Sequence, residues 1–215
     1  MKNLVFILVA YFILMLGSCG SDVLPPIDPT VQAEEDSIII ANYISEIGLA
    51  GQDSILSAGV HYIVLDSGSG ESIDESDIVN FNYIGMTLND TIFDTSIQSV
   101  ADSIRVLVQE DTVGIEASAV QLTLLQAFSE SRSYRPLEVT YSASGWPFSG
   151  RFIRGFEDGL ASSFKQMKVG GRVLVVIPSG QAYGALGSGL LIPPNTVIAF
   201  ELFPVAVVKQ PPLGD

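Results

Sequence analysis

Glycine and proline divide the last part of the chain into short segments, and this restricts what it can fold into. Residues 172–177 (Arg-Val-Leu-Val-Val-Ile) form a strongly β-forming run that stops at Pro178. Residues 184–189 are rich in glycine, and a Pro-Pro pair lies shortly after them. These glycines do not form a phosphate cradle, because no Lys or Ser/Thr pattern follows them. The pattern predicts two strands, over 172–177 and 196–208, joined by a loop.

Further strands are predicted upstream. Residues 59–65 are rich in β-forming side chains, and a Ser/Gly-rich turn follows them. In residues 77–86 apolar side chains alternate with asparagine, which predicts an amphipathic strand with Tyr83 directed inward. A turn at Asn89 and Asp90 ends this strand. The folded domain is therefore expected to begin near residue 59.

A short helix is predicted before the strand at 172–177. Within residues 152–167, Phe152, Ile153, Phe156 and Leu160 recur at spacings that bury one side of a helix against a sheet.

The order and spacing of seven short segments resemble those of the FKBP-type peptidyl-prolyl cis-trans isomerases. The segments are 83–85 (Tyr-Ile-Gly), 93–96 (Phe-Asp-Thr-Ser), 152–160, 167–171, 177–178 (Ile-Pro), 182–184 (Ala-Tyr-Gly) and 192–196 (Ile-Pro-Pro-Asn-Thr). The resemblance covers roughly residues 62–208. It implies an α+β fold in which an antiparallel sheet wraps around a short helix, and a domain that spans 59–208.

The resemblance also implies a site. The Tyr183 hydroxyl would hold a substrate carbonyl, and Asp94 would orient Tyr83. The proline ring would lie in an apolar pocket formed by Phe93, Phe152, Ile153, Phe156, Leu191, Ile192 and Phe200. The resemblance implies no cofactor and no metal. The expected activity is isomerisation of X-Pro bonds in polypeptides, and the alternatives are a non-catalytic chaperone or binding protein and a structural scaffold.

Three features depart from the family pattern: Phe156, Leu137 and an insertion over 97–135. Phe156 stands where the family commonly has tryptophan, so the pocket floor stays apolar but loses an indole N–H. Leu137 stands near a position that is aromatic in the family. Trp146 and Phe148, in a turn-rich segment, could lie over the pocket or cap a loop.

The third departure is an insertion of some forty residues, 97–135, where small members of the family have a short connection. Residues 117–128 within it are predicted to be helical. The insertion could bind clients or shield the site, or it could be a subdomain packed on the sheet.

The N-terminus resembles a bacterial lipoprotein signal. Lys2 precedes an apolar run over 4–16, which is too short to span a bilayer comfortably, and the sequence Leu-Gly-Ser-Cys ends at Cys19. Residues 1–18 would be removed and Cys19 would carry fatty acids such as palmitate. The protein would then be anchored in the cell envelope outside the cytoplasm, with the bacterial outer membrane as the expected site. The alternative is an ordinary secretory signal with an incidental cysteine.

Residues 19–30 read as a Ser/Asp/Pro-rich tether, 31–58 as a helical segment, and 209–215 as a C-terminal tail. Within the helical segment, a helix with an acidic first turn is expected from about residue 31 to Gly48. It could serve as an arm for self-association or client contact, or it could pack on its own domain.

Charge and histidine content limit the classes of ligand and partner that the chain is expected to bind. The formal charge of −14 argues against nucleic acid, because phosphate contacts need clustered Lys and Arg. His61 is the only histidine, so a metal site is not expected, and we predict it to be a strand-surface residue. The expected partners are proline-containing polypeptides and, through Cys19, a membrane.

Overall fold

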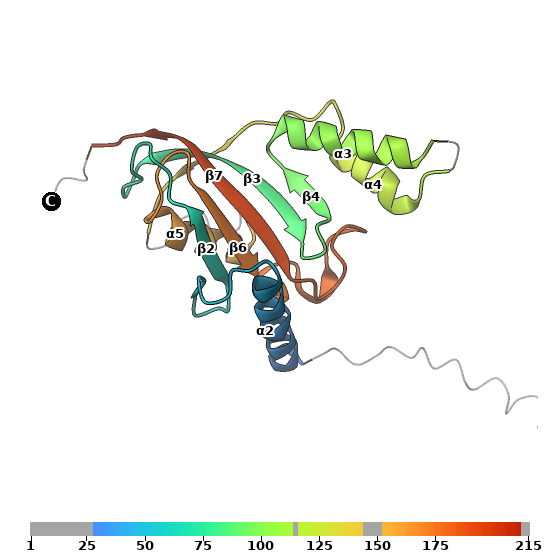
Figure 1. The fold of residues 1–215 in the computed structure, drawn as a ribbon, viewed down its shortest axis with the longest axis horizontal. Helices are drawn as coiled ribbons and strands as arrows, with labels where there is room; N and C mark the ends of the chain where they lie inside the picture. The colour runs from blue at the N-terminus through green and yellow to red at the C-terminus, as the bar shows by residue number, and fades with distance from the viewer. Residues whose placement is uncertain (1–27, 114–115, 144–151, 212–215) are drawn as a thin grey trace, which may run out of the picture.

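A computed structural model of the chain describes residues 28–113, 116–143 and 152–211. Its centre is one antiparallel sheet in the strand order β1-β2-β6-β7-β3-β4, with β5 paired to β3 (Figure 1). The strands are β1 (Ser54–Ile55), β2 (His61–Asp66), β3 (Ile78–Thr87), β4 (Ile92–Thr95), β5 (Leu137–Thr140), β6 (Arg172–Ile177) and β7 (Ile198–Val208). The α+β fold with an antiparallel sheet, expected from the sequence, is confirmed.

The sheet is buried on both faces. Alternate residues of a strand point to opposite faces. In β6, Val173, Val175 and Ile177 belong to one core cluster, whereas Leu174 and Val176 belong to the other. The continuous apolar run in this strand is therefore explained by a helix on each side of the sheet.

Helix α5 (Arg154–Phe164) covers the face that carries the aromatic core. It packs directly on β6 and contains glycine where the two meet. A Cβ atom added to Gly159 would stand 2.3 Å from Val175 Cγ1, so only glycine fits there. Larger side chains on this helix, such as Phe156 and Leu160, pack beside the contact.

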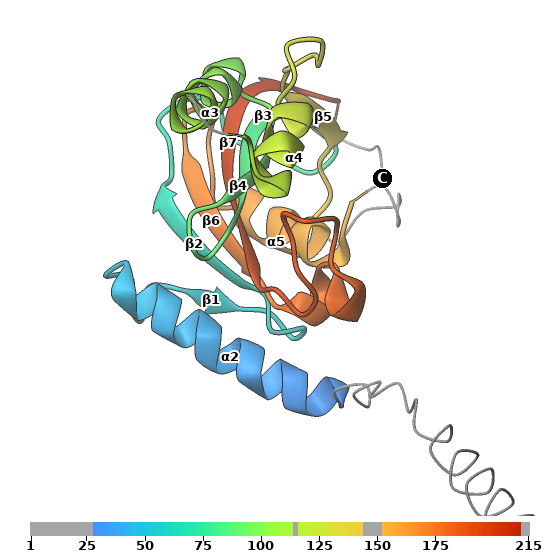
Figure 2. The same ribbon diagram turned by 90° about the vertical axis from the view of Figure 1, so that its right-hand side faces the viewer.

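Helix α2 (Pro29–Glu46) packs on the opposite face through Ile40 and Ile44 (Figure 2). The Asp28 side chain caps it by accepting a hydrogen bond from the Thr30 N–H at 2.8 Å. Because the helix begins earlier than expected, its first turn contains no acidic residue, and the expectation of an acidic first turn is wrong. In this chain the helix packs on its own domain.

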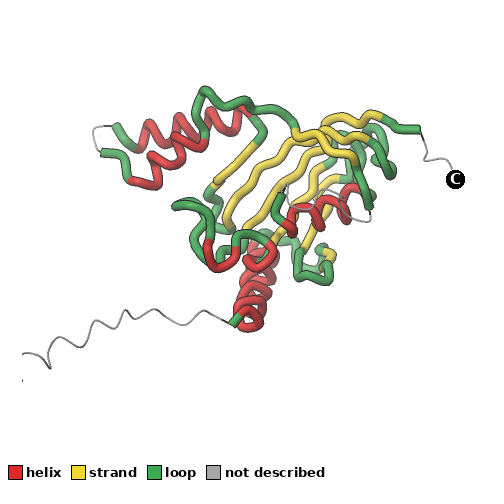
Figure 3. Tube along the Cα trace, turned by 180° about the vertical axis from the view of Figure 1, so that it is seen from behind, coloured by secondary structure: helices red, strands yellow, loops and turns green. Residues whose placement is uncertain are grey.

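The insertion forms a helical hairpin of α3 (Gln98–Asp111) and α4 (Ala119–Ala127), which projects to one side of the sheet (Figure 3). The sequence predicted only the second helix. Phe128, Ala101 and Val108 are the buried apolar residues of the hairpin. Hydrogen bonds within the hairpin include one from Arg105 Nη1 to the Phe128 carbonyl at 2.8 Å.

His61 does not lie on the surface of its strand, and that prediction is wrong. It is buried, and its Nδ1 lies 2.6 Å from Asp53 Oδ2. The short strand β1 pairs outside β2, with Ile55 opposite His61, and this covers the position. Strand β1 was not predicted, because a strand of only two residues leaves no pattern in the sequence.

The expected lipidation residue Cys19 and the signal segment 1–18 lie outside the described residues. Within the described ranges, no helix is both long and apolar enough to cross a membrane.

Candidate active site

A cavity of about 430 Å³ opens between helix α5, the aromatic face of the sheet and the loop after β6. It is lined by Tyr83, Asp94, Leu137, Phe152, Ile153, Phe156, Tyr183 and Phe200. All but Leu137 are residues that the sequence assigned to the site. The three candidate catalytic side chains, which come from β3, β4 and the loop after β6, therefore meet in one hollow.

Aromatic rings form the floor of this cavity. The Phe156 ring centroid lies 4.8 Å from that of Phe200 at an interplanar angle of 74°, and 5.3 Å from that of Phe152. Tyr83 stands edge-on to Phe156 at 6.4 Å. Edge-to-face packing of this kind is favourable for aromatic pairs. Phe156 thus supplies an apolar platform in place of the tryptophan common in the family.

Phe93 packs edge-on to Phe200, with centroids 5.7 Å apart. Gly85 makes room for both rings, because a Cβ atom there would lie 2.6 Å from Phe200 and 2.8 Å from Phe93. A side chain at this position would push the rings out of the site.

The other three predicted pocket residues, Phe93, Leu191 and Ile192, line a neighbouring cavity of about 260 Å³. Asp94 and Tyr183 belong to the walls of both cavities. All ten predicted site residues are therefore gathered around two adjoining hollows. Thr123 and Arg132 of the insertion also line the smaller one, so the insertion contributes directly to the site.

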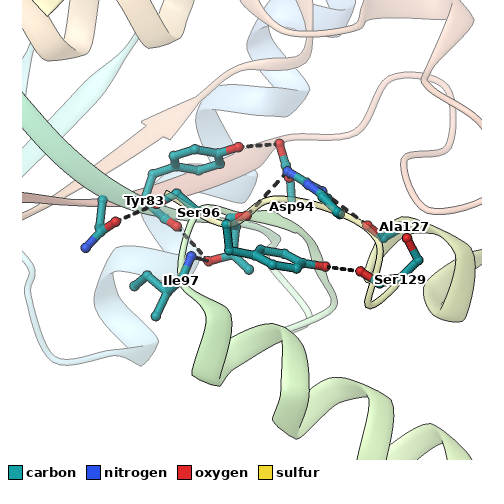
Figure 4. A network of polar contacts seen from close by, with 10 residues as sticks. Tyr83, Asp94, Ser96, Ile97, Ala127 and Ser129 are labelled. Atoms are coloured by element: carbon teal, nitrogen blue, oxygen red, sulfur yellow. Dashed lines mark hydrogen bonds and ion pairs between the residues drawn. The ribbon is translucent and has the colours of Figure 1, made fainter. Parts of the chain in front are cut away.

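Asp94 is the centre of a polar network (Figure 4). Its Oδ2 accepts a hydrogen bond from the Tyr83 hydroxyl at 2.8 Å, and its Oδ1 accepts one from Arg132 Nη2 at 2.5 Å. Arg132 Nη1 also donates to the Ala127 carbonyl at 3.2 Å. Asp94 thus makes the contact with Tyr83 that the resemblance to the family implies.

Arg132 was not predicted. It lies 38 residues beyond Asp94 in the chain, inside the insertion, and nothing in the local sequence marks it. Its guanidinium also lies over the Tyr134 ring, 5.3 Å from the centroid, which adds a cation–π contact. Only the folded hairpin brings it to the carboxylate.

Backbone contacts fix the strand ends that carry these groups. The Thr95 hydroxyl donates to the Tyr83 carbonyl at 2.8 Å and accepts from the Ile97 N–H at 3.1 Å. The Ser96 hydroxyl accepts from the Tyr83 N–H at 3.0 Å. Thr95 and Ser96 are buried, so the residues after Asp94 lock β4 to β3 beside the site.

Both site tyrosines keep their protons at neutral pH. Burial raises the pKa of Tyr83, and the negative charge of Asp94 and the hydrogen bond to it raise it further. Burial and the nearby charge of Asp94 also raise the pKa of Tyr183. An ordinary tyrosine already titrates near pH 10, so each hydroxyl is a hydrogen-bond donor under physiological conditions.

The Tyr183 hydroxyl is the one of the two that is available to donate a hydrogen bond to a substrate. Tyr183 is half-buried, between the short helices η1 (Ser179–Gln181) and η2 (Gly184–Leu186), and it lines both cavities. Among the described residues its hydroxyl has no hydrogen-bond partner, in contrast to that of Tyr83. A carbonyl oxygen in the cavity would find this donor free.

Other features stand apart from the site. A larger cavity of about 640 Å³, between α2 and the loop after β6, contains none of the predicted site residues. Trp146 and Phe148 lie outside the described residues. Within the described ranges, no group of three or more His, Cys, Asp or Glu side chains could hold a metal ion.

Comparison with known proteins identifies the family of the chain. The sequence pattern of the family described as FKBP-type peptidyl-prolyl cis-trans isomerase matches residues 69–203. The chain belongs to this family. Helix α2 precedes the matched region, whereas the insertion lies within it.

Individual relatives match over shorter stretches. The chain is 37% identical over 68 residues to an FK506-binding protein of Neisseria meningitidis serogroup A, a match that covers 32% of this chain and 53% of the relative. It is 49% identical over 45 residues to a probable FKBP-type 25 kDa peptidyl-prolyl cis-trans isomerase of Pseudomonas aeruginosa, covering 21% and 20%. The chain thus spans about half the length of the first relative and a fifth of the second.

Two solved structures are similar at low identity. A peptidyl-prolyl cis-trans isomerase from Pseudomonas syringae is 22% identical, with a TM-score of 0.46 and coverage of 85% of this chain and 98% of that chain. FkpA from Escherichia coli is 24% identical, with a TM-score of 0.46 and coverage of 85% and 63%.

Proposed function

We propose that this protein is a peptidyl-prolyl cis-trans isomerase that acts on polypeptides outside the cytoplasm. Family membership supports the reaction class. The observation that carries the proposal is the free Tyr183 hydroxyl at an apolar cavity floored by the Phe156 and Phe200 rings.

The reaction needs no nucleophile. Rotation about a peptide bond crosses a barrier of about 18–20 kcal/mol because amide resonance must be broken. Water stabilises the charge-separated planar amide, so an apolar cavity favours the twisted form relative to the planar one. Each factor of ten in rate requires about 1.4 kcal/mol of differential stabilisation, so desolvation and one or two hydrogen bonds are sufficient for a useful acceleration.

The residues have separate roles in this proposal. Phe152, Ile153, Phe156 and Phe200 hold the proline ring, and Leu137 closes the same cavity. The Tyr183 hydroxyl donates to the substrate carbonyl. Phe93, Leu191 and Ile192 form the adjoining wall on which the flanking chain lies.

Asp94 acts on the bound amide in two ways. It fixes the Tyr83 ring through the hydrogen bond of 2.8 Å, and its negative charge shapes the field at the edge of the cavity. Tyr83 and Asp94 therefore set the orientation and electrostatics of the site, whereas Tyr183 contacts the substrate.

The test is isomerisation of a proline-containing peptide by the full chain, compared with Tyr183→Phe and Phe156→Ala. We expect kcat/KM to fall roughly tenfold in Tyr183→Phe, as for the loss of one hydrogen bond worth about 1–1.5 kcal/mol. It should fall further in Phe156→Ala, where the floor is lost. Tyr43→Phe is the matched control, because Tyr43 packs on the other face of the sheet. Turnover that is unchanged in both site variants would refute the proposal.

A second candidate, a chaperone that holds unfolded clients, is favoured by exposed apolar side chains on the hairpin. Val106, Leu107, Val120 and Leu122 are all more than two-fifths exposed, and Thr123 on the same hairpin lines the site. Apolar patches on a surface often mark interaction sites. Suppression of aggregation that persists in Tyr183→Phe but is lost in Leu107→Ser would support this function.

We also propose that Cys19 is lipidated and anchors the protein in the cell envelope. The support is the apolar run over 4–16 followed by Leu-Gly-Ser-Cys. Two or more acyl chains on one residue give stable anchoring. Incorporation of a labelled fatty acid into the wild type but not into Cys19→Ser is expected, and equal incorporation into both would rule out this residue.

Self-association through α2 is a further proposal. Ile38 and Ile39 lie on the exposed side of the helix while Ile40 and Ile44 are buried. Sedimentation of the wild type and of a variant with Ile38→Ser and Ile39→Ser tests it. The wild type should sediment as an oligomer and the variant as a monomer, and equal masses would refute an interface through these residues.

A further inference from the structure

A buried carboxylate joins helix α2 to the loop that carries Tyr183. Asp36 is only 1% exposed, and Ser179 is wholly buried. Asp36 Oδ2 accepts hydrogen bonds from both the backbone N–H and the hydroxyl of Ser179, each at 2.7 Å. Its Oδ1 accepts a third from Gln32 Nε2 at 2.9 Å. A carboxylate is tolerated in such a place because its oxygens are hydrogen-bonded.

Ser179 lies four residues before Tyr183, and the chain between them is short and internally bonded. The Gln181 N–H donates to the Pro178 carbonyl at 2.9 Å, and the Ala182 N–H donates to the Ser179 carbonyl at 3.0 Å. Because these hydrogen bonds restrict the backbone between the two residues, the position of Ser179 determines that of Tyr183.

The far end of the loop is held separately. The Gly187 N–H donates to the Tyr183 carbonyl at 3.2 Å, and the Asn195 N–H donates to the Gly184 carbonyl at 2.8 Å. Asp36 therefore adds a contact at the start of the loop, just after Ile177 of β6 pairs with Ile198 in the sheet.

Helix α2, which carries Asp36, is itself held in place by packing on the sheet. Ile40 and Ile44 follow Asp36 at intervals of four residues, so all three lie on one buried face of the helix. The two isoleucines pack on the sheet with Ile63 and Leu174. The loop thus has a second connection to the sheet, through a helix whose Asp36 lies 143 residues from Ser179 in sequence and outside the family match.

We propose that Asp36 is a positioning residue for catalysis: it holds the loop after β6 so that the Tyr183 hydroxyl faces the cavity. This proposal rests on the proposed isomerase function. Asp36 does not touch the substrate, since it lines the larger cavity on the α2 side and not the one floored by Phe156. Its effect is exerted through Ser179.

The test compares Asp36→Ala with two controls on the same helix. Glu35→Ala removes an exposed carboxylate next in sequence, and Ile44→Ala weakens the docking of α2 while leaving the Asp36 contacts in place. At a temperature where every variant is folded, Asp36→Ala should lower kcat/KM roughly tenfold, because small misplacements of a catalytic group are costly. Glu35→Ala and Ile44→Ala should stay near the wild type.

Two further variants separate positioning from general stability. Asp36→Asn keeps one oxygen that can accept both bonds from Ser179, so it should recover most of the activity. In a Tyr183→Phe background, Asp36→Ala should have little additional effect, since the group it positions has gone. A full tenfold loss in that background would overturn the proposal, as would equal losses in Asp36→Ala and Ile44→Ala.

Hydrogen exchange gives a readout independent of turnover. The amides of residues 179–183 should exchange roughly tenfold faster in Asp36→Ala than in the wild type, and at the wild-type rate in Glu35→Ala. Unchanged exchange in Asp36→Ala would refute the proposal that Asp36 holds the loop. A wild type without turnover would instead refute the proposed function, and the exchange data would still decide whether Asp36 holds the loop.

Discussion

Helix α2 and the insertion are attached to the candidate site in contrasting ways. Each contributes one charged side chain. Asp36 of α2 is buried against Ser179, whereas Arg132 of the insertion meets Asp94 with both side chains about one-third exposed. A buried carboxylate with both oxygens hydrogen-bonded is costly to disturb, while a partly exposed ion pair contributes little to stability. The contact of Asp36 is suited to fix the loop after β6, and that of Arg132 is suited to modulate the charge of Asp94.

Packing shows the same difference. Helix α2 places Ile40 and Ile44 in a cluster of aliphatic side chains on the sheet. Helix α4 of the insertion has no buried residue, and the hairpin is closed mainly by Phe128, Ala101 and Val108. We therefore expect the hairpin to open locally at lower free energy than α2.

The largest expected effect is on stability. Ile40→Ala should lower the free energy of unfolding by about 2–5 kcal/mol, because it leaves a cavity under α2. Val120→Ala on α4, where the side chain is 44% exposed, should change it by less than about 0.5 kcal/mol. Urea denaturation measures both. Equal losses would show that the two segments are equally part of the core.

The next effect concerns alkaline pH. Because the pKa of Tyr83 is raised by burial and by Asp94, the folded state holds this proton more tightly than the unfolded state. Its contribution to stability is complete below about pH 10 and is lost as the pH rises above that. Tyr83→Phe should flatten the alkaline decline, at a cost of about 1 kcal/mol at neutral pH for the lost hydrogen bond.

Tyr43 on α2 provides the comparison. Its pKa is also raised, first by burial and then by Asp90 and Glu201, but it is only half-buried. Tyr43→Phe should therefore flatten the decline less than Tyr83→Phe. Denaturant titrations at several alkaline pH values would decide, and a larger change in Tyr43→Phe would contradict the account.

Only a small effect on stability is expected at Arg132. Arg132→Ala should lower the free energy of unfolding by less than about 1 kcal/mol. It should still lower kcat/KM, because Asp94 loses a partner. Arg135→Ala, which removes an exposed arginine nearby, is the control. Salt at about 1 M shortens the screening length to about 3 Å and should narrow the difference in kcat/KM between wild type and Arg132→Ala. Identical kinetics for Arg132→Ala and Arg135→Ala would contradict a role for the pair.

The sequence could predict the residues whose positions follow from local pattern. Alternation in β3 placed Tyr83 inward, and helical spacing placed Phe156 toward the sheet; these two positions depend on strand and helix period, which neighbouring residues determine. Asp94, Tyr183 and Phe200 were assigned to the same pocket by the resemblance to the family, and the structure brings them together.

The contacts it could not predict are those between distant segments. Arg132 and Asp36 reach their partners across 38 and 143 residues, through a hairpin and a helix whose docking depends on tertiary packing. His61 was misplaced for the same reason, because the strand that covers it is too short to recognise. Helix α3 was missed because several of its apolar residues are β-branched, which does not favour a helix, and only Ala101 and Val108 are buried.

The most direct test is whether the full chain speeds exchange between the cis and trans forms of a proline peptide at equilibrium. Uncatalysed exchange takes tens to hundreds of seconds, so at mixing times of about one second NMR shows no exchange peaks for the peptide alone. We predict strong cis–trans exchange peaks with catalytic amounts of the protein, and weaker ones with Tyr183→Phe. A spectrum without exchange peaks in the presence of the wild type would contradict the central claim.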